Sequence, residues 1–479
     1  MVLTNSAKNV KILFESEVVL LTSQIYNWRS EMLRLSRYAQ IVDCGNDFYV
    51  AYHSLFGMPI IIDKVARSVL KDYESPREQH PKDDPRLSLD MAEQLGYLIV
   101  KDDFDEEKLL QERLNMNNQA LERGERIKYL SLITSESCNF RCSYCFAEPF
   151  SDQRTTAKLM QPDIAFKAID SFCQLLLAKG TKEADINFGG GEPLINFNTI
   201  KRSVEYLEEQ FPQIRFTFGI NTNASLINTE VAHFFKDHVF RITTSLDGLP
   251  STSDRVRKLP NGQPASPMIL SGFAALDEAG IPINGFAITI NEANYDEIDE
   301  RVIDWAENRG YNHDLRFDLD AIHMVCIDPD EVIQKLMRLK RYGTSRGILI
   351  HGFWDRPIEN LFSSILEEQT GFCGGQRGES MCVAPNGDIF VCGYSGIKVG
   401  SVIEPGQTLP NPTYIDLIKS RYVGNTERCR GCEIEGQCMG GCLICEEFAK
   451  KSNSSALDFN CRLYRGMTVE LLKEQAINS

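Results

Sequence analysis

The sequence has little that would suit a membrane, an export route or a nucleic-acid partner. No apolar run reaches the roughly 18 residues that a membrane span needs. Residues 1–20 lack the basic flank, long apolar centre and small-residue cleavage site of an export signal. Lys and Arg number 51 against 67 Asp and Glu, which gives a net charge of −16, and no basic stripe offsets it locally. We therefore expect a cytoplasmic protein that binds neither a membrane nor nucleic acid.

What the chain does have is cysteine. The composition is otherwise that of a globular protein, with 479 residues, 43% of them apolar and 25% charged, enough for about three domains. Its 15 cysteines stand in a sequence without an export signal. That context argues against a disulfide framework and favours metal binding.

Residues 1–125 are predicted to form a small module of strands and helices. Short apolar stretches at 38–42, 47–53 and 58–63 precede an amphipathic segment at 64–73. A charged helical segment at 105–126 then leads away from the module. We place a domain boundary near residue 125.

Residues 126–342 alternate apolar strands with helical segments. This alternation predicts an α/β fold with a parallel sheet, in which working residues follow the C-terminal ends of strands. The six units are fewer than a closed eightfold barrel requires. The expected strands are 128–134, 184–188, 215–220, 239–246, 283–290 and 315–322.

Three cysteines follow the first of these strands. Cys138, Cys142 and Cys145 would fill three of the four ligand positions of a four-iron cluster and leave one iron open. A zinc site is the alternative, since Cys142 and Cys145 would supply half of one, but no fourth Cys or His lies nearby.

The spacing C-x3-C-x2-C, with Tyr144 before the last cysteine, resembles the signature of the radical S-adenosylmethionine (radical SAM) enzymes. The resemblance extends along the whole central segment. It implies a partial (β/α)6 barrel in which an electron from the cluster cleaves bound S-adenosylmethionine. The resulting 5′-deoxyadenosyl radical takes hydrogen from an unactivated carbon.

The stretch GGGEP at 189–193 matches the family's GGEP motif. The match implies that Gly190, Gly191 and Glu192 hold the amino end of S-adenosylmethionine. Glycines let a backbone approach a ligand closely, and a carboxylate suits an ammonium group. An ordinary turn between a strand and a helix is the alternative interpretation.

Two further segments resemble the positions that contact the ribose and carboxylate of S-adenosylmethionine. The third strand ends in NTNA (221–224), and SLDG (245–248) is followed by SDRVR (253–257). Ser245 and Arg257 are the best matches for cofactor binding. Asn223 and Asp247 match less closely, and either could instead satisfy local backbone groups as a turn residue.

Residues 343–479 contain nine cysteines and little regular periodicity. The order of seven of these cysteines with Gly387 resembles the SPASM extension of peptide-modifying radical SAM enzymes, which binds two auxiliary iron–sulfur clusters. The resemblance assigns an outer set, Cys429, Cys432, Cys438 and Cys461, and an inner set, Cys373, Cys392 and Cys442.

Five cysteines remain outside that assignment. Cys382 is the candidate for the fourth inner ligand, or else a buried thiol that packs a hairpin at 383–392. Cys445 fits no position in the pattern. Cys44, Cys173 and Cys326 stand in apolar contexts and are expected in the core.

Two features bear on the substrate. Sulfatase-maturing relatives carry an acidic residue after the cysteine that matches Cys392, whereas this chain has Gly393. The order of elements in the N-terminal module resembles the winged-helix units that bind leader peptides, although a capping or dimerisation domain would have the same pattern.

The resemblance therefore implies an oxidoreductase with three [4Fe-4S] clusters and S-adenosylmethionine. We expect it to install an oxidative crosslink, a thioether or a carbon–carbon bond, in a ribosomally synthesised precursor peptide with a leader segment. A reductant such as flavodoxin or ferredoxin would supply electrons. The alternatives are a formylglycine-forming maturase, another radical modification of a side chain, and a non-catalytic iron–sulfur electron carrier.

Overall fold

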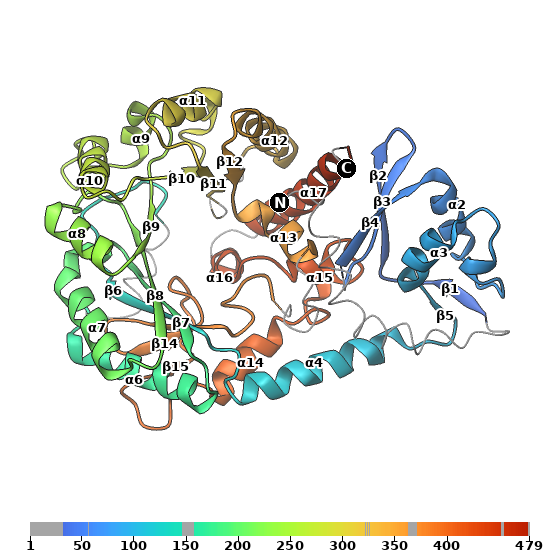
Figure 1. Ribbon diagram of the computed structural model, residues 1–479, viewed down its shortest axis with the longest axis horizontal. Coiled ribbons are helices and arrows are strands. Elements are labelled where there is room, and N and C mark those ends of the chain that lie inside the picture. The colour runs from blue at the N-terminus through green and yellow to red at the C-terminus, as the bar shows by residue number, and fades with distance from the viewer. Residues whose placement is uncertain are drawn as a thin grey trace.

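A curved row of mostly parallel strands occupies the left-hand part of the molecule in Figure 1. The computed structural model describes residues 32–55, 57–145, 158–320, 322, 324, 326–362, 371–451 and 455–477. Each strand of the first half of the sheet pairs in parallel with the next. These strands are β6 (Tyr129–Ser135), β7 (Glu183–Gly190), β8 (Arg215–Thr222) and β9 (Arg241–Thr244).

Three further parallel strands continue this arrangement. They are β10 (Gly285–Ile290), β11 (Asp314–Leu319) and β12 (Leu349–His351). A bridge between Ser245 and Ala287 joins the end of β9 to β10. All six predicted strands are present, which confirms the α/β fold class, and β12 is a seventh that the sequence analysis did not include.

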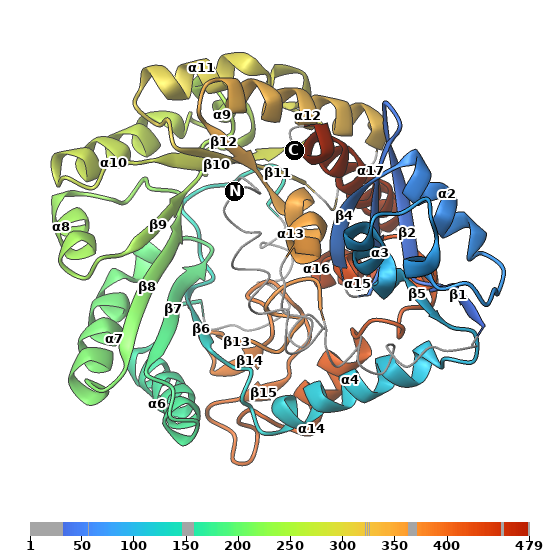
Figure 2. The ribbon, with the colours of Figure 1, turned by 45° about the vertical axis from the view of Figure 1, so that its right-hand side comes forward.

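Along each strand, successive side chains point to opposite faces of the sheet, and helices cover one of these faces. In β7, Ile186 and Phe188 are buried in the main core, while Asp185 and Asn187 are half-buried on the opposite face. Figure 2 shows the helices outside the curved sheet. They are α6 (Pro162–Ala178), α7 (Phe197–Gln210), α8 (Thr229–Asp237), α9 (Pro250–Val256), α10 (Ser266–Glu278), α11 (Glu300–Asn308) and α12 (Pro329–Ser345).

Side-chain caps fix where several of these helices begin. Asn228 accepts a hydrogen bond from the backbone N–H of Val231 at the start of α8. Asp328 caps α12 in the same manner, and Pro329 follows at the first helical position, where its missing N–H costs nothing. These caps direct each chain segment back onto the sheet.

The N-terminal module holds a three-stranded antiparallel sheet in the order β2 (Ala39–Gly45), β3 (Phe48–His53) and β4 (Gly57–Asp63). The helix α2 (Lys64–Asp72) follows, capped by Asp63. The predicted strand and helix order is therefore present. The remaining elements are α3 (Leu89–Leu95) and the small antiparallel pair β1 (Leu33–Leu35) and β5 (Ile99–Lys101).

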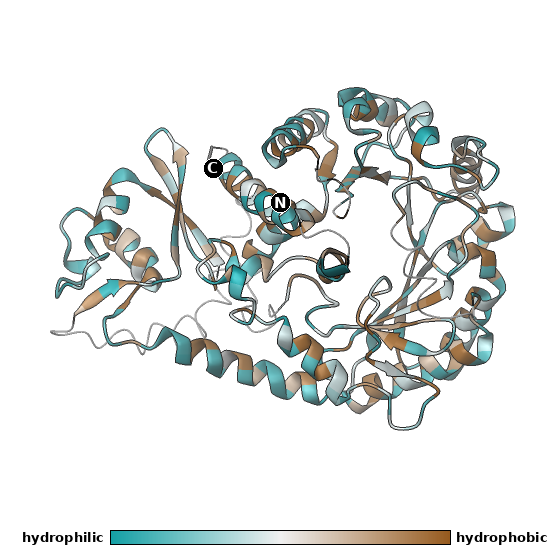
Figure 3. Cartoon of the chain, turned by 180° about the vertical axis from the view of Figure 1, so that it is seen from behind, coloured by the Kyte–Doolittle hydropathy of each residue, from teal (hydrophilic) through white to brown (hydrophobic). Residues whose placement is uncertain are grey.

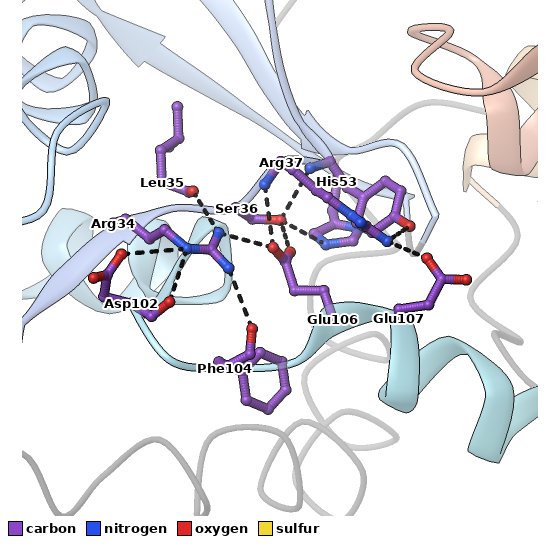
Figure 4. A network of polar contacts seen from close by, with 10 residues as sticks. Arg34, Leu35, Ser36, Arg37, His53, Asp102, Phe104, Glu106 and Glu107 are labelled. Atoms are coloured by element: carbon purple, nitrogen blue, oxygen red, sulfur yellow. Dashed lines mark hydrogen bonds and ion pairs between the residues drawn. The ribbon is translucent and has the colours of Figure 1, made fainter.

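A polar network joins this module to α4 (Glu106–Glu122), the long helix that leads to the barrel (Figure 4). The carboxylate of Glu106 pairs with Nη1 of Arg34 at 2.9 Å and accepts a hydrogen bond from the hydroxyl of Ser36. His53 accepts from the N–H of Leu55 at Nδ1, so its Nε2 donates to Ser36 over 3.2 Å. Glu106 is buried, and it therefore anchors the module to the start of α4.

The C-terminal part extends the sheet past β6 and covers the open side of its curve. The strand β13 (Ser380–Val383) pairs in parallel with β6 and in antiparallel with β14 (Asp388–Phe390), which confirms the predicted hairpin; β15 (Gly400–Ser401) follows at the edge. Figure 2 shows α13 and α16 opposite the strands. The helices here are α13 (Arg356–Phe362), α14 (Pro412–Ser420), α15 (Glu435–Cys438), α16 (Leu443–Lys451) and α17 (Ser455–Ile477).

The N-terminal and C-terminal parts contact each other directly. The helix α17 packs against β2, β3 and α12, and α13 packs against β4. Figure 3 shows hydrophilic and hydrophobic residues mixed along the helices. None of the helices formed by the described residues has the length and apolar character that a membrane span requires.

Candidate active site

The three cysteines after β6 lie together at the C-terminal edge of the sheet. The pKa of Cys142 is raised to about 12, mainly by burial; the charges of Cys145 and Cys138 contribute to this rise, while Arg257 opposes it. Burial also raises the pKa of Cys138, and the charge of Cys145 contributes to this rise. The fold therefore brings these thiols within electrostatic reach of one another and of a buried guanidinium.

Backbone hydrogen bonds hold the cysteine loop against the end of α9. The N–H of Arg141 donates to the carbonyl of Lys258 at 2.7 Å, and that of Ser143 donates to the carbonyl of Val256 at 2.9 Å. These two carbonyls flank Arg257. The loop and Arg257 are therefore fixed relative to each other.

The glycines at the end of β7 pack against the start of the same loop. Gly190 has a φ of +126°, and a β-carbon there would collide with the carbonyl oxygen of Ser135. A β-carbon on Gly191 would collide with the carbonyl of Ser137. Both glycines are thus required by the close approach of the cysteine loop, in addition to the ligand role predicted for them.

Glu192 is fully buried beside these glycines. Its carboxylate accepts hydrogen bonds from the hydroxyl of Thr222 at 2.7 Å and from the N–H groups of Asn223 and Leu194 at 2.8 and 3.1 Å. Burial raises the pKa of Glu192 to about 7, although these hydrogen bonds act to lower it. A cationic group beside it would restore the ionised form, which is the chemistry expected of an ammonium site.

Asn223 connects the end of β8 to the cysteine loop. Its Nδ2 donates to Oδ1 of Asn139 at 2.9 Å and lies 3.9 Å from Sγ of Cys138. Its Oδ1 accepts from the N–H of Ser225 at 3.0 Å. Asn223 therefore satisfies a local backbone group, as the turn-residue interpretation expects. It also contacts Cys138, a predicted cluster ligand.

Asp247 stands at the centre of a second buried group. Arg257 donates to it from Nε and Nη2, at 2.8 and 3.2 Å, and the hydroxyl of Tyr144 donates to it at 2.6 Å. The N–H of Thr289 adds a fourth hydrogen bond at 2.8 Å. Ser245 is half-buried nearby, at its bridge to β10.

The four cysteines predicted for the outer cluster line one cavity of about 270 Å³, although 32 positions separate the first from the last. Burial raises the pKa of the Cys438 thiol, and the charges of Cys461, Cys429 and Cys432 raise it further. Arg428 and Arg465 also line the cavity. The site therefore offers four thiols and positive charge, which suits an anionic iron–sulfur cluster.

The thiols predicted for the inner cluster also converge. Burial raises the pKa of Cys392. The pKa is also raised by the charges of three nearby thiols, those of Cys382, Cys442 and Cys373. Cys382 lies in this group and also packs with Ala384 of the hairpin. Both interpretations of Cys382 thus correspond to contacts in the structure.

Cys445 belongs to the same group, which the sequence pattern did not predict. It is buried, and its hydrogen bond to Cys442 lowers the pKa of that thiol. Cys442 immediately precedes α16, and backbone groups of Cys445 and Ile444 also point at it. The spacing Cys442-x2-Cys445 is the signal that identifies this contact.

Of the three cysteines expected in the core, Cys173 is buried and Cys44 is half-buried. The prediction is wrong for Cys326, which is exposed on the connection after β11, where its N–H donates to Glu292. Met324, two positions earlier, is still buried, so an apolar neighbourhood in sequence did not reveal that Cys326 itself is at the surface.

Gly393 lies against the barrel, where a β-carbon would come within 3.0 Å of Cδ1 of Ile133.

In the described part of the chain, no three His, Cys, Asp or Glu side chains form a group that could hold a single metal ion. The iron–sulfur ligand sets, like the cofactor contacts, remain predictions.

Comparison with known proteins adds an independent observation. The family model described as the radical SAM superfamily matches residues 132–303. This part of the chain is therefore a radical SAM domain. The match runs from within β6 to within α11, and so includes the cysteine loop, Glu192, Asp247 and Arg257.

One curated relative matches along almost the whole chain. The radical SAM cyclopropyl synthase TigE of Paramaledivibacter caminithermalis is 23% identical over 466 residues, which cover 93% of this chain and 97% of TigE. The match therefore extends beyond residues 132–303 into both the N-terminal and the C-terminal parts of the chain.

Two solved structures share the fold. The structure of anSMEcpe with bound AdoMet superposes with a TM-score of 0.59 at 17% identity, covering 73% of this chain and 98% of that one. The structure of Streptococcus suis SuiB bound to S-adenosylmethionine has a TM-score of 0.52 at 15% identity, covering 88% and 98%. Other structures hold anSMEcpe with the Cp18Cys peptide and SuiB with the precursor peptide SuiA.

Proposed function

We propose that this radical SAM protein is an oxidative maturase that closes a new bond in a ribosomally synthesised precursor peptide. The observation that carries the proposal is the gathering of three thiol groups from distant parts of the sequence. One follows β6, one lines the outer cavity and one surrounds Cys392. An enzyme that only cleaved S-adenosylmethionine would need just the first group.

The residues fit their predicted roles. Cys138, Cys142 and Cys145 would hold the radical-generating cluster, and the buried carboxylate of Glu192 would receive the amino group of S-adenosylmethionine. When bound, this cofactor pair supplies a 5′-deoxyadenosyl radical that removes one hydrogen atom from carbon. Arg257, fixed by Asp247, would orient the cofactor's carboxylate.

Bond closure in the substrate then requires the loss of one more electron and one proton. The thiols of Cys373, Cys392 and Cys442, with Cys382 or Cys445, would hold the group that accepts the electron. Gly393 offers no carboxylate at the position where sulfatase-maturing relatives have one, and Ile133 leaves little room for one. Formylglycine formation is therefore the less favoured reaction.

The relative that matches almost the whole chain, TigE, favours one type of bond. TigE is a cyclopropyl synthase, and a cyclopropyl ring arises by joining two carbons that each lose hydrogen. Carbon–carbon closure, between two residues or within one, is accordingly preferred here over a thioether. SuiB and anSMEcpe, which share the fold, have been seen with peptides bound, which supports a peptide substrate.

Mass spectrometry of a small peptide co-expressed from a neighbouring reading frame tests this function. We expect a product lighter by two hydrogen atoms than the encoded peptide. Tandem fragmentation separates a link between two residues from a ring within one residue, because only the link between residues suppresses the fragments between them. A product that gains oxygen, or loses sulfur, would contradict the proposal.

We further propose that the N-terminal module recognises the leader segment. The module rests directly on the loop of the outer thiols, since Tyr52 donates to the carbonyl of Glu433 at 3.1 Å and the N–H of Gly436 donates to Ser54 at 2.8 Å. Deleting the module would remove these contacts too, so a binding measurement on the whole chain is the sharper test.

Hydrogen exchange with and without the precursor provides that measurement. We expect slower exchange in residues 39–63 with the full precursor and no change with a peptide that lacks the leader. Protection confined to the barrel in both cases would place leader recognition elsewhere.

A further inference from the structure

The outer and inner thiol sets are joined by a very short loop. Cys438 belongs to the outer set and Cys442 to the inner set. Met439, Gly440 and Gly441 between them all have left-handed backbones, with φ values of 46°, 83° and 75°. This winding turns their carbonyl groups away from ordinary helical partners, so the loop needs other donors.

Two arginines and Gln376, whose Nε2 donates to the carbonyl of Gly441 at 2.8 Å, supply those donors. Nη2 of Arg421 donates to the carbonyl of Gly441 at 3.2 Å, and Nη2 of Arg428 donates to the carbonyl of Gly440 at 3.0 Å. Arg428 lines the outer cavity. Arg421 lies deeper, at the end of α14, and is only 5% exposed.

Arg421 is incompletely satisfied within the described residues. Its Nη1 pairs with the carboxylate of Glu446, which also pairs with Lys450 at 2.7 Å. Its Nε is buried and has no hydrogen-bond partner there. A buried N–H donor without an acceptor is costly, so an acceptor at this point would stabilise the folded protein.

Arg421 lies beside both thiol sets. The carbonyl to which it donates, that of Gly441, immediately precedes Cys442 of the inner set and is three residues from Cys438 of the outer set. A four-iron cluster with thiolate ligands is anionic, and its potential rises with nearby positive charge and with hydrogen bonds to its sulfur atoms. A buried cation acts more strongly than an exposed one, because solvent screens it less.

We propose that Arg421 is a positioning residue that tunes the inner auxiliary site to accept the electron from the substrate radical. The inference rests on the proposed function, in which this site holds an iron–sulfur cluster. As the new bond closes, the substrate radical loses one electron and one proton. The thiols of Cys392 and Cys442 would hold the group that takes up the electron, the outer thiols would hold the group that passes it to a one-electron carrier protein, and the proton would pass to solvent. Arg421 would favour this transfer because its buried charge lies against the loop that joins the two sets.

The test compares two charge changes of opposite sign on the same ion pair. Arg421→Gln removes the cation, and Glu446→Gln removes the anion that partly cancels it. Both are measured as holoenzymes in which Cys138, Cys142 and Cys145 are alanine, so that only auxiliary clusters give signals. We expect the midpoint potential of the inner cluster, followed by electron paramagnetic resonance, to fall in Arg421→Gln and to rise in Glu446→Gln.

A matched control is Lys450→Gln, because it removes the other cation from the same carboxylate at a side chain that is 72% exposed. We expect a much smaller shift there. Arg421→Lys, which keeps the charge and loses the fork, should fall between the parent and Arg421→Gln. If Arg421→Gln loses iron, the comparison of Arg421→Lys and Glu446→Gln with the parent decides the question.

Two results would overturn the role of Arg421. One is a full iron content with unchanged potentials in Arg421→Gln and Glu446→Gln, and the other is a shift of both variants in the same direction, as general disturbance of the site would give. Absence of auxiliary iron from the parent protein is a different outcome, because it would refute the cluster assignment of the proposed function itself.

Discussion

Asp247 holds Arg257 by two hydrogen bonds, from Nε at 2.8 Å and from Nη2 at 3.2 Å, with its carboxylate fully shielded from solvent. The resemblance to the radical SAM enzymes assigns Arg257 to the carboxylate of S-adenosylmethionine. In this structure the guanidinium is already paired, so the cofactor would have to share it with Asp247. Asp247 is then the residue that fixes the direction of the remaining donors.

The first prediction concerns this pair. Arg257→Lys keeps the charge but cannot donate to Asp247 in the same two-point geometry, so we expect S-adenosylmethionine to bind about tenfold more weakly, or about 1.4 kcal/mol. Equilibrium dialysis of the reconstituted protein measures the affinity. Tyr144→Phe removes only the third hydrogen bond to Asp247 and should cost much less. Unchanged affinity in Arg257→Lys would show that the guanidinium serves the fold alone.

The strands were predictable because their patterns are local. Ile186 and Phe188 alternate with polar residues in β7, and the same alternation marks β10, so periodicity finds both. In contrast, β12 has three residues, and its first, Leu349, is 54% exposed. So short a strand carries no period, and only its pairing with β11 defines it.

The cysteine groups were predictable from spacing, whereas their surroundings were not. Cys445 touches Cys442 because α16 begins between them, and Arg421 reaches the Cys438–Cys442 loop from the end of α14. These contacts depend on how separate elements pack, which no window of sequence contains. The same holds for Arg257 and Asp247, whose pairing depends on the turn into α9.

The second prediction separates the thiol groups by role. Alanine at Cys138, Cys142 and Cys145 should abolish 5′-deoxyadenosine formation, because the site for radical generation is lost. Alanine at Cys373 and Cys392 should leave 5′-deoxyadenosine but no closed peptide product. Each variant should lose roughly four irons. Circular dichroism must be compared, since metal binding contributes to folding.

A well-folded Cys373 and Cys392 variant that makes the closed product at the parent rate would contradict this assignment. In that case the inner group would be structural, and the electron would leave the substrate by another route.

The third prediction concerns the junction of the N-terminal module with α4. Glu106→Ala leaves Arg34 and Ser36 without their shared buried acceptor, so we expect a loss of about 2–4 kcal/mol from the local stability of the module. Glu107→Ala is the matched control, because its ion pair with Arg37 is exposed and should contribute under about 1 kcal/mol. Hydrogen exchange over residues 33–101 measures both; equal effects would refute the anchoring role of Glu106.

The fourth prediction is a pH dependence caused by Asp355, which follows β12 in a short 3-10 turn (Phe353–Asp355). The side chain is 6% exposed, and its Oδ1 has no partner among the described residues. Burial raises the pKa of Asp355 to about 7, while Lys340 opposes the shift. The folded protein therefore keeps a proton that the unfolded chain releases near pH 4, so this carboxyl lowers stability progressively from about pH 4 to about pH 7.

Asp355→Asn cannot ionise and should remove that loss. Because one pKa unit corresponds to about 1.4 kcal/mol, we expect the variant to gain about 1 kcal/mol more at about pH 8 than at about pH 6. Thermal unfolding of the anaerobic holoprotein, followed by circular dichroism at both pH values, measures the difference. Glu359→Gln removes a neighbouring carboxylate that is 57% exposed and should respond equally at both. A gain in Asp355→Asn that does not depend on pH would mean that the carboxyl is ionised in the folded protein, with Lys340 compensating its charge.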